Sequence, residues 1–205
     1  MKVLGICCSG RLHGNTEILL QEALNSAEEM GAEVELVTLA KKHIVPCDGC
    51  WSCQETGKGC HIKDDILDVL AKIVEAEGVI FGSPVYILSV TGQAKVLLDR
   101  CISLRGMGRI SSRKKVGGVI VTTGRVGAMN AVSVFRGFFA HRWINAGAAI
   151  GFTGAMKEDK VKGKTPRDRI LSDKVAMREA GDLGRAVVKR IEEVSLIHDL
   201  KKKAE

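Results

Sequence analysis

Four cysteines in one short stretch of the chain have a spacing that could hold a metal centre. They follow the pattern C-x2-C-x2-C-x6-C, at Cys47, Cys50, Cys53 and Cys60. Two-residue spacers let three thiolates turn inward from one loop and bind three irons of a cubane, and the longer last spacer lets the fourth thiolate close over the remaining iron. The tandem ferredoxin motif ends in C-x3-C-P, but no proline follows Cys60. The spacing therefore favours one self-contained [4Fe-4S] cluster.

Two other interpretations of this loop stay open. Four thiolates also make a closed structural zinc site, although separated C-x2-C pairs are more typical of zinc than an unbroken run of two-residue spacers. Plain reduced thiols are the third interpretation. Backbone freedom for a metal centre would come from Gly49, Gly57 and Gly59. Trp51, between two of the cysteines, could shield a cluster from water or pack at a subunit contact.

The remaining cysteines and the histidines suggest less chemistry. Cys7 and Cys8 end an apolar run and Cys101 lies on an apolar helix face, so we expect all three to be small buried packing residues. Seven cysteines is an odd number, which favours metal binding or redox chemistry in a reducing compartment over a disulfide framework. His13 is expected to be exposed to solvent. The other histidines show no ligand spacing: His43, His61, His141 and His198.

Three loops that follow predicted strands could together bind a cofactor. Residues 9–16 lead into a helix, so their hydroxyls and backbone amides can surround an anion at the helix N-terminus. Residues 82–86 contain a rigid proline and an aromatic side chain that could border a planar heterocycle. Residues 122–127 offer hydroxyls and free amides for a ring edge or a ribityl chain. The ordinary structural interpretations are a helix cap, a proline-fixed turn and a glycine-containing connection.

The hydrophobic pattern predicts a scaffold that would bring these loops together. Apolar runs typical of buried strands cover residues 2–8, 33–39, 78–82, 116–122 and 148–153. Helical periodicity separates the runs, over residues 15–30, from about 64 to 73, through Lys95, Leu98 and Cys101, and over about 128–142. Apolar strands that alternate with helices are typical of a parallel sheet covered on both faces. Ligands of such sheets bind beyond the carboxyl ends of the strands, where all three loops are expected.

The composition changes after Gly154. The next residues, MKEDKVKGKTPRDR, are polar and are expected to form an exposed connector. A helix is predicted from about residue 170 to 200, and the closing KKKAE is interpreted as a solvated tail. The inward-facing side chains of that helix are expected to be Val175, Ala176, Leu183, Ala186, Val187 and Ile191. We find no internal repeat and no second segment with a core of its own.

The composition of the chain says less about its function than the motifs do. The net charge of +7 comes with only 4% aromatic residues and no arginine-rich stretch interleaved with aromatics, so nucleic acid binding is not expected. A basic surface suits an anionic cofactor, a nucleotide or an acidic electron-transfer partner equally well. No apolar run reaches the length of a membrane span and the first residues do not form a signal peptide, so we expect no membrane association and a cytoplasmic location.

The loop sequences resemble the NADPH-dependent FMN reductase branch of the flavodoxin-like superfamily over about residues 1–153. The resemblance is carried by SGRLHGNT, GSPVYILSVTGQAKVLLDR and VTTGR, although Cys8 and Gly10 stand where Gly and Pro are usual. It implies a doubly wound five-stranded parallel sheet of order 2-1-3-4-5, with residues 154–205 as a basic connector and C-terminal helical extension. The FMN-binding residues that it implies are Ser9, Arg11, Asn15 and Thr16 for the phosphate, Pro84, Val85 and Tyr86 beside the isoalloxazine, and Thr122, Thr123 and Gly124 as a third wall.

With the cysteine motif added, the chain is similar to the iron-sulfur flavoproteins of anaerobic prokaryotes. That family implies FMN, one [4Fe-4S] cluster, electrons from ferredoxin or a similar carrier, and assembly into homodimers or homotetramers. Flavins transfer one or two electrons and a cluster transfers one, so a protein with both can split or collect electron pairs. Positive groups near the flavin, such as Arg11 or Arg125, would favour its reduced anion, and no catalytic acid or base is named.

Two other functions remain open on the same residues. One is an NAD(P)H-dependent FMN or quinone reductase whose cysteines are structural. The other is a non-enzymatic, zinc-stabilised interaction protein on the same scaffold. A brown protein with labile sulfide would support the iron-sulfur flavoprotein. A yellow protein that oxidises NADPH would support the reductase, and a colourless zinc protein would support the interaction protein.

Overall fold

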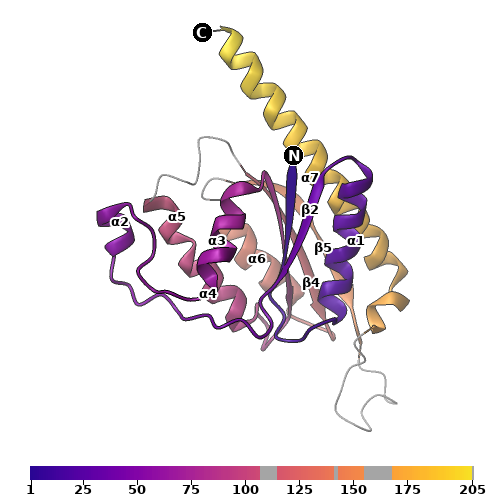
Figure 1. Ribbon diagram of the computed structural model, residues 1–205. Coiled ribbons are helices and arrows are strands. Elements are labelled where there is room, and N and C mark those ends of the chain that lie inside the picture. Colours follow the sequence, from indigo (N-terminus) through magenta and orange to yellow (C-terminus); the bar gives the residue numbers. More distant parts are fainter. Residues whose placement is uncertain (107–114, 141–142, 155–167, 205) are drawn as a thin grey trace.

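A parallel sheet of five strands in the order β2-β1-β3-β4-β5 forms the centre of the molecule (Figure 1), which confirms the predicted topology. The computed structural model describes residues 1–106, 115–140, 143–154 and 168–204. The strands are β1 (Lys2–Cys7), β2 (Glu33–Thr38), β3 (Gly78–Pro84), β4 (Val116–Thr123) and β5 (Ile144–Phe152). The apolar runs of β1, β3 and β4 are buried almost throughout because helices cover both faces of these central strands.

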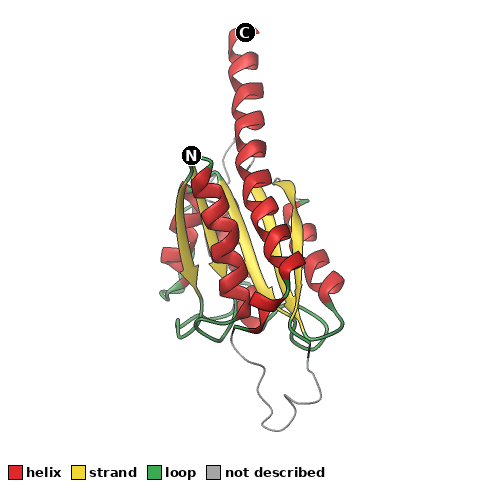
Figure 2. Cartoon of the chain, turned by 90° about the vertical axis from the view of Figure 1, so that its right-hand side faces the viewer, coloured by secondary structure: helices red, strands yellow, loops and turns green. Residues whose placement is uncertain are grey.

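Two layers of helices cover the sheet. The longer helices are α1 (Asn15–Glu29), α3 (Ile66–Glu75), α4 (Gly92–Arg100), α6 (Ala128–Phe139) and α7 (Lys174–Ala204). Short helical segments are α2 (Ser52–Thr56), α5 (Ile102–Gly106) and the 3-10 turn η2 (Arg169–Ser172). One core lies between the sheet and α1 with α7, which run side by side in Figure 2. The other lies between the sheet and α3, α4 and α6.

The α1–α7 layer depends on close backbone contact. A methyl group on Gly184 of α7 would lie 2.0 Å from the carbonyl oxygen of Ala23 in α1, so only glycine permits this approach. Ala176, Leu183, Val187 and Ile191 are buried as predicted, whereas Ala186 is half-buried and Val175 is exposed. The prediction for Val175 was wrong because Ala176, and not its neighbour Val175, faces the sheet in the first turn of α7, where a methyl group on Gly151 of β5 would lie 3.4 Å from Cβ of Ala176.

Aromatic side chains fill the opposite core. Phe81 of β3 stacks on Phe135 of α6 at a centroid distance of 5.4 Å, and Phe139 stacks on Trp143 at 5.6 Å. Such pairs contribute about 0.5–1.5 kcal/mol each beyond the burial of their area. This aromatic cluster reaches the amino end of β4, where a methyl group on Gly117 would lie 2.5 Å from the Phe139 ring.

The bounds of several elements differ from the sequence prediction. β5 begins at Ile144 rather than 148, because its first residues are irregular: the ladder shifts register between Gly117 and Gly118, and Gly147 has a φ of 138°. The segment predicted as one loop up to residue 62 contains α2, and α5 follows α4. Helix α6 ends at Phe139, and the proposed connector beyond Gly154 lies largely outside the described residues.

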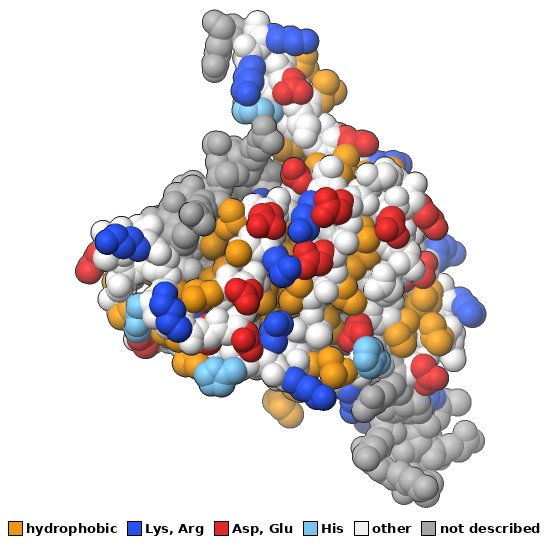
Figure 3. Space-filling model, viewed as in Figure 1, with side chains coloured by type: hydrophobic (Ala, Val, Ile, Leu, Met, Phe, Trp, Pro, Cys, Tyr) orange, Lys and Arg blue, Asp and Glu red, His pale blue; other side chains and the backbone are white. Residues whose placement is uncertain are grey.

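The end of α7 extends beyond the body of the molecule (Figures 1 and 2). Leu196, Ile197 and Leu200 on this end are 61%, 55% and 58% exposed. On the face seen in Figure 3, acidic and basic side chains are interspersed over the described surface, so the net charge is not concentrated there. None of the described helices is both long and apolar enough to cross a membrane.

Candidate functional site

The three loops predicted to bind a cofactor meet at the carboxyl edge of the sheet, because their strands are neighbours. In the register of the sheet, Cys7 lies opposite Gly82, and Pro84 lies opposite Thr122. The hydroxyls of Thr16 and Thr122 are 2.7 Å apart, although 106 positions separate them in the sequence. The amide of Val85 donates to the carbonyl of Thr122 at 2.8 Å. Hydrogen bonds thus join the first loop to the third and the third to the second.

The first loop presents backbone amides at the start of α1. Ser9 is buried and its Oγ accepts a hydrogen bond from the amide of Arg11 at 3.0 Å. Gly14, the N-cap of α1, provides no side-chain cap, so the first amides of the helix can receive an anion. Asn15 accepts a hydrogen bond from the amide of Ile170 at 2.9 Å, which ties this loop to the C-terminal segment. The arrangement fits a phosphate group.

His13 lies on the outside of this loop, as predicted. Its side chain is 79% exposed, and its ring nitrogen Nδ1 lies 3.0 Å from the Glu17 carboxylate. The backbone amide of His13 donates to the same carboxylate at 3.0 Å. Glu17, in the first turn of α1, is therefore paired with His13.

The second loop contains a strained turn. Tyr86 pairs with Ser89 across two residues, Ile87 and Leu88, whose φ angles are 42° and 61°. Two positive φ values in a two-residue hairpin define a type I′ turn, which normally takes Asn and Gly. Ile87 is 97% exposed, and Tyr86 and Leu88 are about half exposed. A strained apolar turn of this kind suits a functional edge better than a purely structural one.

The third loop packs against the second. Gly127, the N-cap of α6, has a φ of 90°, and a methyl group there would lie 2.8 Å from Cα of Leu88. Thr122 and Thr123 are buried, Gly124 is exposed, and the Thr123 hydroxyl donates to the carbonyl of Val126 at 2.8 Å. The ten residues predicted to bind FMN thus lie at one edge of the sheet. They are Ser9, Arg11, Asn15 and Thr16 in the first loop, Pro84, Val85 and Tyr86 in the second, and Thr122, Thr123 and Gly124 in the third. Their contact with a flavin stays a prediction.

The four cysteines of the predicted metal site line one cavity of about 150 Å³. Cys47 and Cys50 are exposed, Cys60 is half-buried and Cys53, on α2, is 8% exposed. The cavity is also lined by Trp51, Gln54, Arg100 and Ile102, among others. Four thiols around one cavity are, in type and number, the donors of a [4Fe-4S] cluster or a closed zinc site. No three of these four sulfurs lie within 4.8 Å of one another, so the fit to a metal centre rests on the kind of donor and on the shared cavity.

Backbone conformations in this loop agree with the role given to its glycines. The φ angles of Gly49, Gly57 and Gly59 are 72°, 65° and 92°. Trp51 has a φ of 58° and is 63% exposed at the rim of the cavity, which leaves it free to shield a cluster or to contact another molecule. Gln54 anchors α2 through a hydrogen bond from its amide group to the carbonyl of Ile102, at 2.8 Å.

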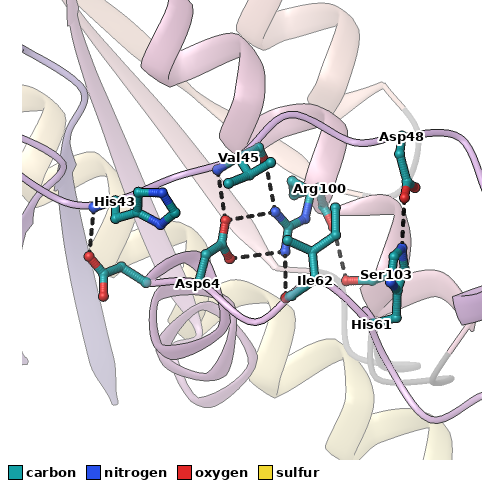
Figure 4. Close-up of polar contacts among 9 residues, drawn as sticks. His43, Val45, Asp48, His61, Ile62, Asp64, Arg100 and Ser103 are labelled. Atoms are coloured by element: carbon teal, nitrogen blue, oxygen red, sulfur yellow. Dashed lines mark hydrogen bonds and ion pairs between the residues drawn. The ribbon is translucent and has the colours of Figure 1, made fainter.

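A buried ion pair holds the two ends of the cysteine loop (Figure 4). Arg100, the last residue of α4, donates to the carbonyl of Val45 at 2.7 Å and to that of Ile62 at 3.2 Å. The same guanidinium makes two hydrogen bonds to Asp64, at 2.9 and 3.0 Å. Both side chains are completely buried, and Asp64 also accepts the amide of Val45 at 2.8 Å. The segment from Cys47 to Cys60 is thus clamped on both sides.

The ionisation of this pair reflects its mutual contacts. Burial raises the pKa of Asp64, but the hydrogen bonds from Arg100 and from the Val45 amide outweigh it, so the pKa lies below its usual value. Burial lowers the pKa of Arg100, and Asp64 together with the neighbouring Cys60 sulfur reverses that effect, so the pKa is raised. Both groups are charged at neutral pH.

A second group of ligand-type side chains lies on the rim of the cavity. Nε2 of His61 lies 2.8 Å from the Asp48 carboxylate, and potential ligand atoms of Asp48, Cys50 and His61 lie within 4.8 Å of one another. All three residues are exposed. Because Cys50 belongs to both groups, this set would compete with the four-cysteine site for the same thiolate.

The other three cysteines are buried, as predicted. Cys7 and Cys8 are fully buried and Cys101 is 2% exposed. Burial raises the pKa of Cys7 to about 11 and of Cys101 to about 12, and raises that of Cys8 well above its usual value. These thiols stay protonated at neutral pH and are poor metal ligands.

Sequence reasoning missed three residues near the cysteines. Arg100 ends the segment GSPVYILSVTGQAKVLLDR but has no role in the sequence analysis, and Asp64 is only the first residue of a predicted helix there. His61 follows Cys60 directly, which was the available signal. His141 lies outside the described residues. The positions of Asp64 and Arg100 are 36 residues apart, and only the fold brings them together.

Comparison with known proteins supports both predicted cofactors. The family model described as NADPH-dependent FMN reductase matches residues 1–155. An iron-sulfur flavoprotein of Methanocaldococcus jannaschii is 40% identical over 195 residues, which cover 91% of this chain and 95% of that protein.

Solved structures show the same fold. A flavone reductase superposes with a TM-score of 0.69 and 21% identity over 95% of this chain, which spans 64% of the length of that enzyme. A flavodoxin from the domain Archaea superposes with a TM-score of 0.56 and 13% identity, and covers 94% of this chain and 99% of its own. At these identities the likeness concerns the fold alone.

Proposed function

Because this chain belongs to the NADPH-dependent FMN reductase family and, within it, to the iron-sulfur flavoproteins, we propose that it passes electrons between an FMN and a [4Fe-4S] cluster. It is a flavin-dependent oxidoreductase. FMN supplies two-electron and one-electron chemistry, and the cluster supplies one-electron transfer. The observation that carries the proposal is a four-cysteine cavity in the same molecule as a flavin-type loop edge.

Helix α4 connects the two halves of the site. Its N-cap, Thr91, donates from its hydroxyl to the carbonyl of Cys8 at 2.7 Å, beside the first flavin loop. Its last residue, Arg100, lines the cysteine cavity. A helix of this length, from Gly92 to Arg100, spans about 13 Å. The two proposed cofactor sites therefore lie at opposite ends of one short rigid element.

The flavin-side residues have distinct proposed roles. The amides at the start of α1, with Ser9 and Thr16, would hold the phosphate, since helix N-termini favour anions. The apolar turn at Ile87 would exclude water from one side of the ring. Arg11 and Arg125 would add positive charge that favours the reduced anion. We assign no proton donor among the described residues.

The electron donor is proposed by chemistry rather than by a visible contact. A reduced ferredoxin or a similar one-electron carrier matches a cluster that is close to the surface, because Cys47 and Cys50 are exposed. NAD(P)H is the alternative donor, and it would deliver a hydride to the flavin. Nucleic acid and membranes are not proposed as partners, and the cytoplasm is the proposed location.

We also propose a homo-oligomer, either dimer or tetramer. The exposed apolar side chains at the protruding end of α7, Leu196, Ile197 and Leu200, support this proposal because monomers seldom leave such a cluster uncovered. Light scattering on the wild type and on a variant with serine at all three positions measures it. A lower mass for the variant is expected, and an unchanged mass contradicts a role for this end of α7.

Anaerobic purification followed by iron, acid-labile sulfide and FMN assays tests the central proposal. The expected result is about four irons and four acid-labile sulfides for each bound FMN. Cys50→Ala should lose the iron and keep the flavin, whereas Cys101→Ala, which removes the buried thiol that follows α4, should keep both. Flavin without iron, with NADPH oxidation, would favour the simple reductase. Zinc without flavin would favour the interaction protein.

A further inference from the structure

We propose that Arg100 is a positioning and charge-tuning residue of the cluster, and that Asp64 opposes its charge. The geometry behind this proposal is that Arg100 is 1% exposed and lines the same cavity as the four cysteines. The inference rests on the proposed function, because it concerns how this chain would act on the cluster.

The hydrogen bonds of Arg100 leave one donor unused. The two terminal nitrogens bind Asp64 and the carbonyls of Val45 and Ile62. Among the described residues, the buried Nε has no hydrogen-bond partner. A buried N–H group without an acceptor costs about 1–3 kcal/mol, so an acceptor is expected when the cavity is filled. The residues of this chain that share the cavity point to sulfur, either the Cys60 thiolate or a cluster sulfide.

Charge near a cluster changes its reduction potential. Hydrogen bonds to the sulfurs and the net charge around them are the main protein contributions to that potential. Reduction adds negative charge, so a buried guanidinium stabilises the reduced state and raises the potential. Asp64, bound to the same guanidinium and equally buried, offsets part of this effect. Because arginine stays protonated, the contribution persists at any physiological pH.

Variants of the two residues separate charge tuning from simple support of the loop. Arg100→Gln removes the positive charge, and we expect a midpoint potential more negative than that of the wild type. Asp64→Asn removes the opposing charge, and we expect a more positive midpoint potential. A clamp with only a mechanical role would loosen in both variants, so both potentials would then move in the same direction.

An EPR-monitored redox titration of the anaerobically purified protein measures these shifts. Lys95→Gln and Asp99→Asn, an exposed ion pair on the same helix, are the matched controls and should leave the potential unchanged. Circular dichroism and thermal melting of the cluster-free proteins check that each variant folds. Arg100→Lys keeps the charge but lacks the Nε–H group, so its midpoint potential should be more negative than that of the wild type, by less than in Arg100→Gln. This variant keeps the test available if Arg100→Gln does not fold.

The outcomes are distinct. Opposite shifts for Arg100→Gln and Asp64→Asn support the inference. Shifts of the same sign, or a potential for Arg100→Lys equal to that of the wild type, overturn it. A wild-type chain that holds no iron contradicts the proposed function, which the iron assay detects before any potential is measured.

Discussion

The flavin-type loops and the cysteine loop are held in opposite ways. The flavin loops begin at strand ends, and their hydrogen bonds join one loop to another, as between Thr16 and Thr122 or Val85 and Thr122. The cysteine loop crosses no strand and is tied at its two ends to Arg100 and Asp64. Between those ends Cys47 and Cys50 are exposed.

This difference shows what positions the loops in each half of the site. The sheet arranges the flavin loops before any ligand arrives, so binding there needs little reorganisation. The cysteine loop has a preformed frame and an anchor at Gln54, and we expect its exposed part, from Cys47 to Cys50, to gain further order from the metal centre, since metal binding contributes directly to folding. Five predictions can break or sharpen this contrast.

The largest expected effect comes from the clamp. Breaking a completely buried ion pair costs about 3–5 kcal/mol, so Asp64→Asn should lower the free energy of unfolding of the cluster-free protein by that amount. Asp99→Asn, which breaks the exposed Lys95–Asp99 pair, should cost about 0–1 kcal/mol. Urea denaturation measures both. Equal effects would mean that the clamp is no more important than a surface contact.

The clamp should also depend on pH. The pKa of Asp64 is lower in the folded protein than in the unfolded one, so its stabilising contribution is complete above the unfolded value of about 4 and is lost as the pH falls through the lower folded value. The stability difference between wild type and Asp64→Asn should therefore be constant from neutral pH down to about 5 and shrink below about 4. A difference that grows with acidity would contradict the assignment.

The next effect concerns the scaffold of the flavin loops. Gly184→Ala would place a methyl group 2.0 Å from the Ala23 carbonyl and push α7 away from α1, at a cost of about 1–3 kcal/mol or more. FMN affinity should fall as well, since α1 carries the phosphate loop, while the iron content should stay unchanged. Gly137→Ala on α6 has nothing within 4 Å and should stabilise the protein by about 0.5–1 kcal/mol.

A smaller effect is expected for the hydroxyl pair. Thr16→Val leaves the buried Thr122 hydroxyl without this partner, at a cost of about 1–2 kcal/mol, and should weaken FMN binding. Thr16→Ser keeps the hydroxyl and should lie close to the wild type in both respects. Thermal melting and flavin fluorescence titration distinguish the two variants. Identical flavin affinity in the valine and serine variants would remove Thr16 from the binding site.

The smallest effect concerns the strained turn. Leu88→Gly relieves a φ of 61° and should stabilise the flavin-free protein by about 1 kcal/mol. If the apolar turn covers the ring, the same change should weaken FMN binding. Stability and affinity that rise together would show that the strain serves no flavin contact. Iron content is the control and should not change, because the turn lies outside the cysteine cavity.

The sequence by itself determined the fold class and the two cofactor motifs. Apolar runs that alternate with helical periodicity predicted the parallel sheet, and the carboxyl ends of its strands gave the flavin loops. The spacing of four cysteines identified the metal loop, and the same reasoning assigned Cys7, Cys8 and Cys101 to the core. These signals are local, so a single stretch of chain contains each of them.

Only the tertiary structure decided which polar side chains support the metal loop. Arg100 is the last residue of α4 and Asp64 lies in the loop before α3, and nothing in either local sequence indicates that their charges meet in a buried position. The same holds for the approach of Gly184 to Ala23, which places α7 against α1. Such contacts depend on how whole elements pack across the sheet, and the energy of a buried pair comes from the surroundings that exclude water from it.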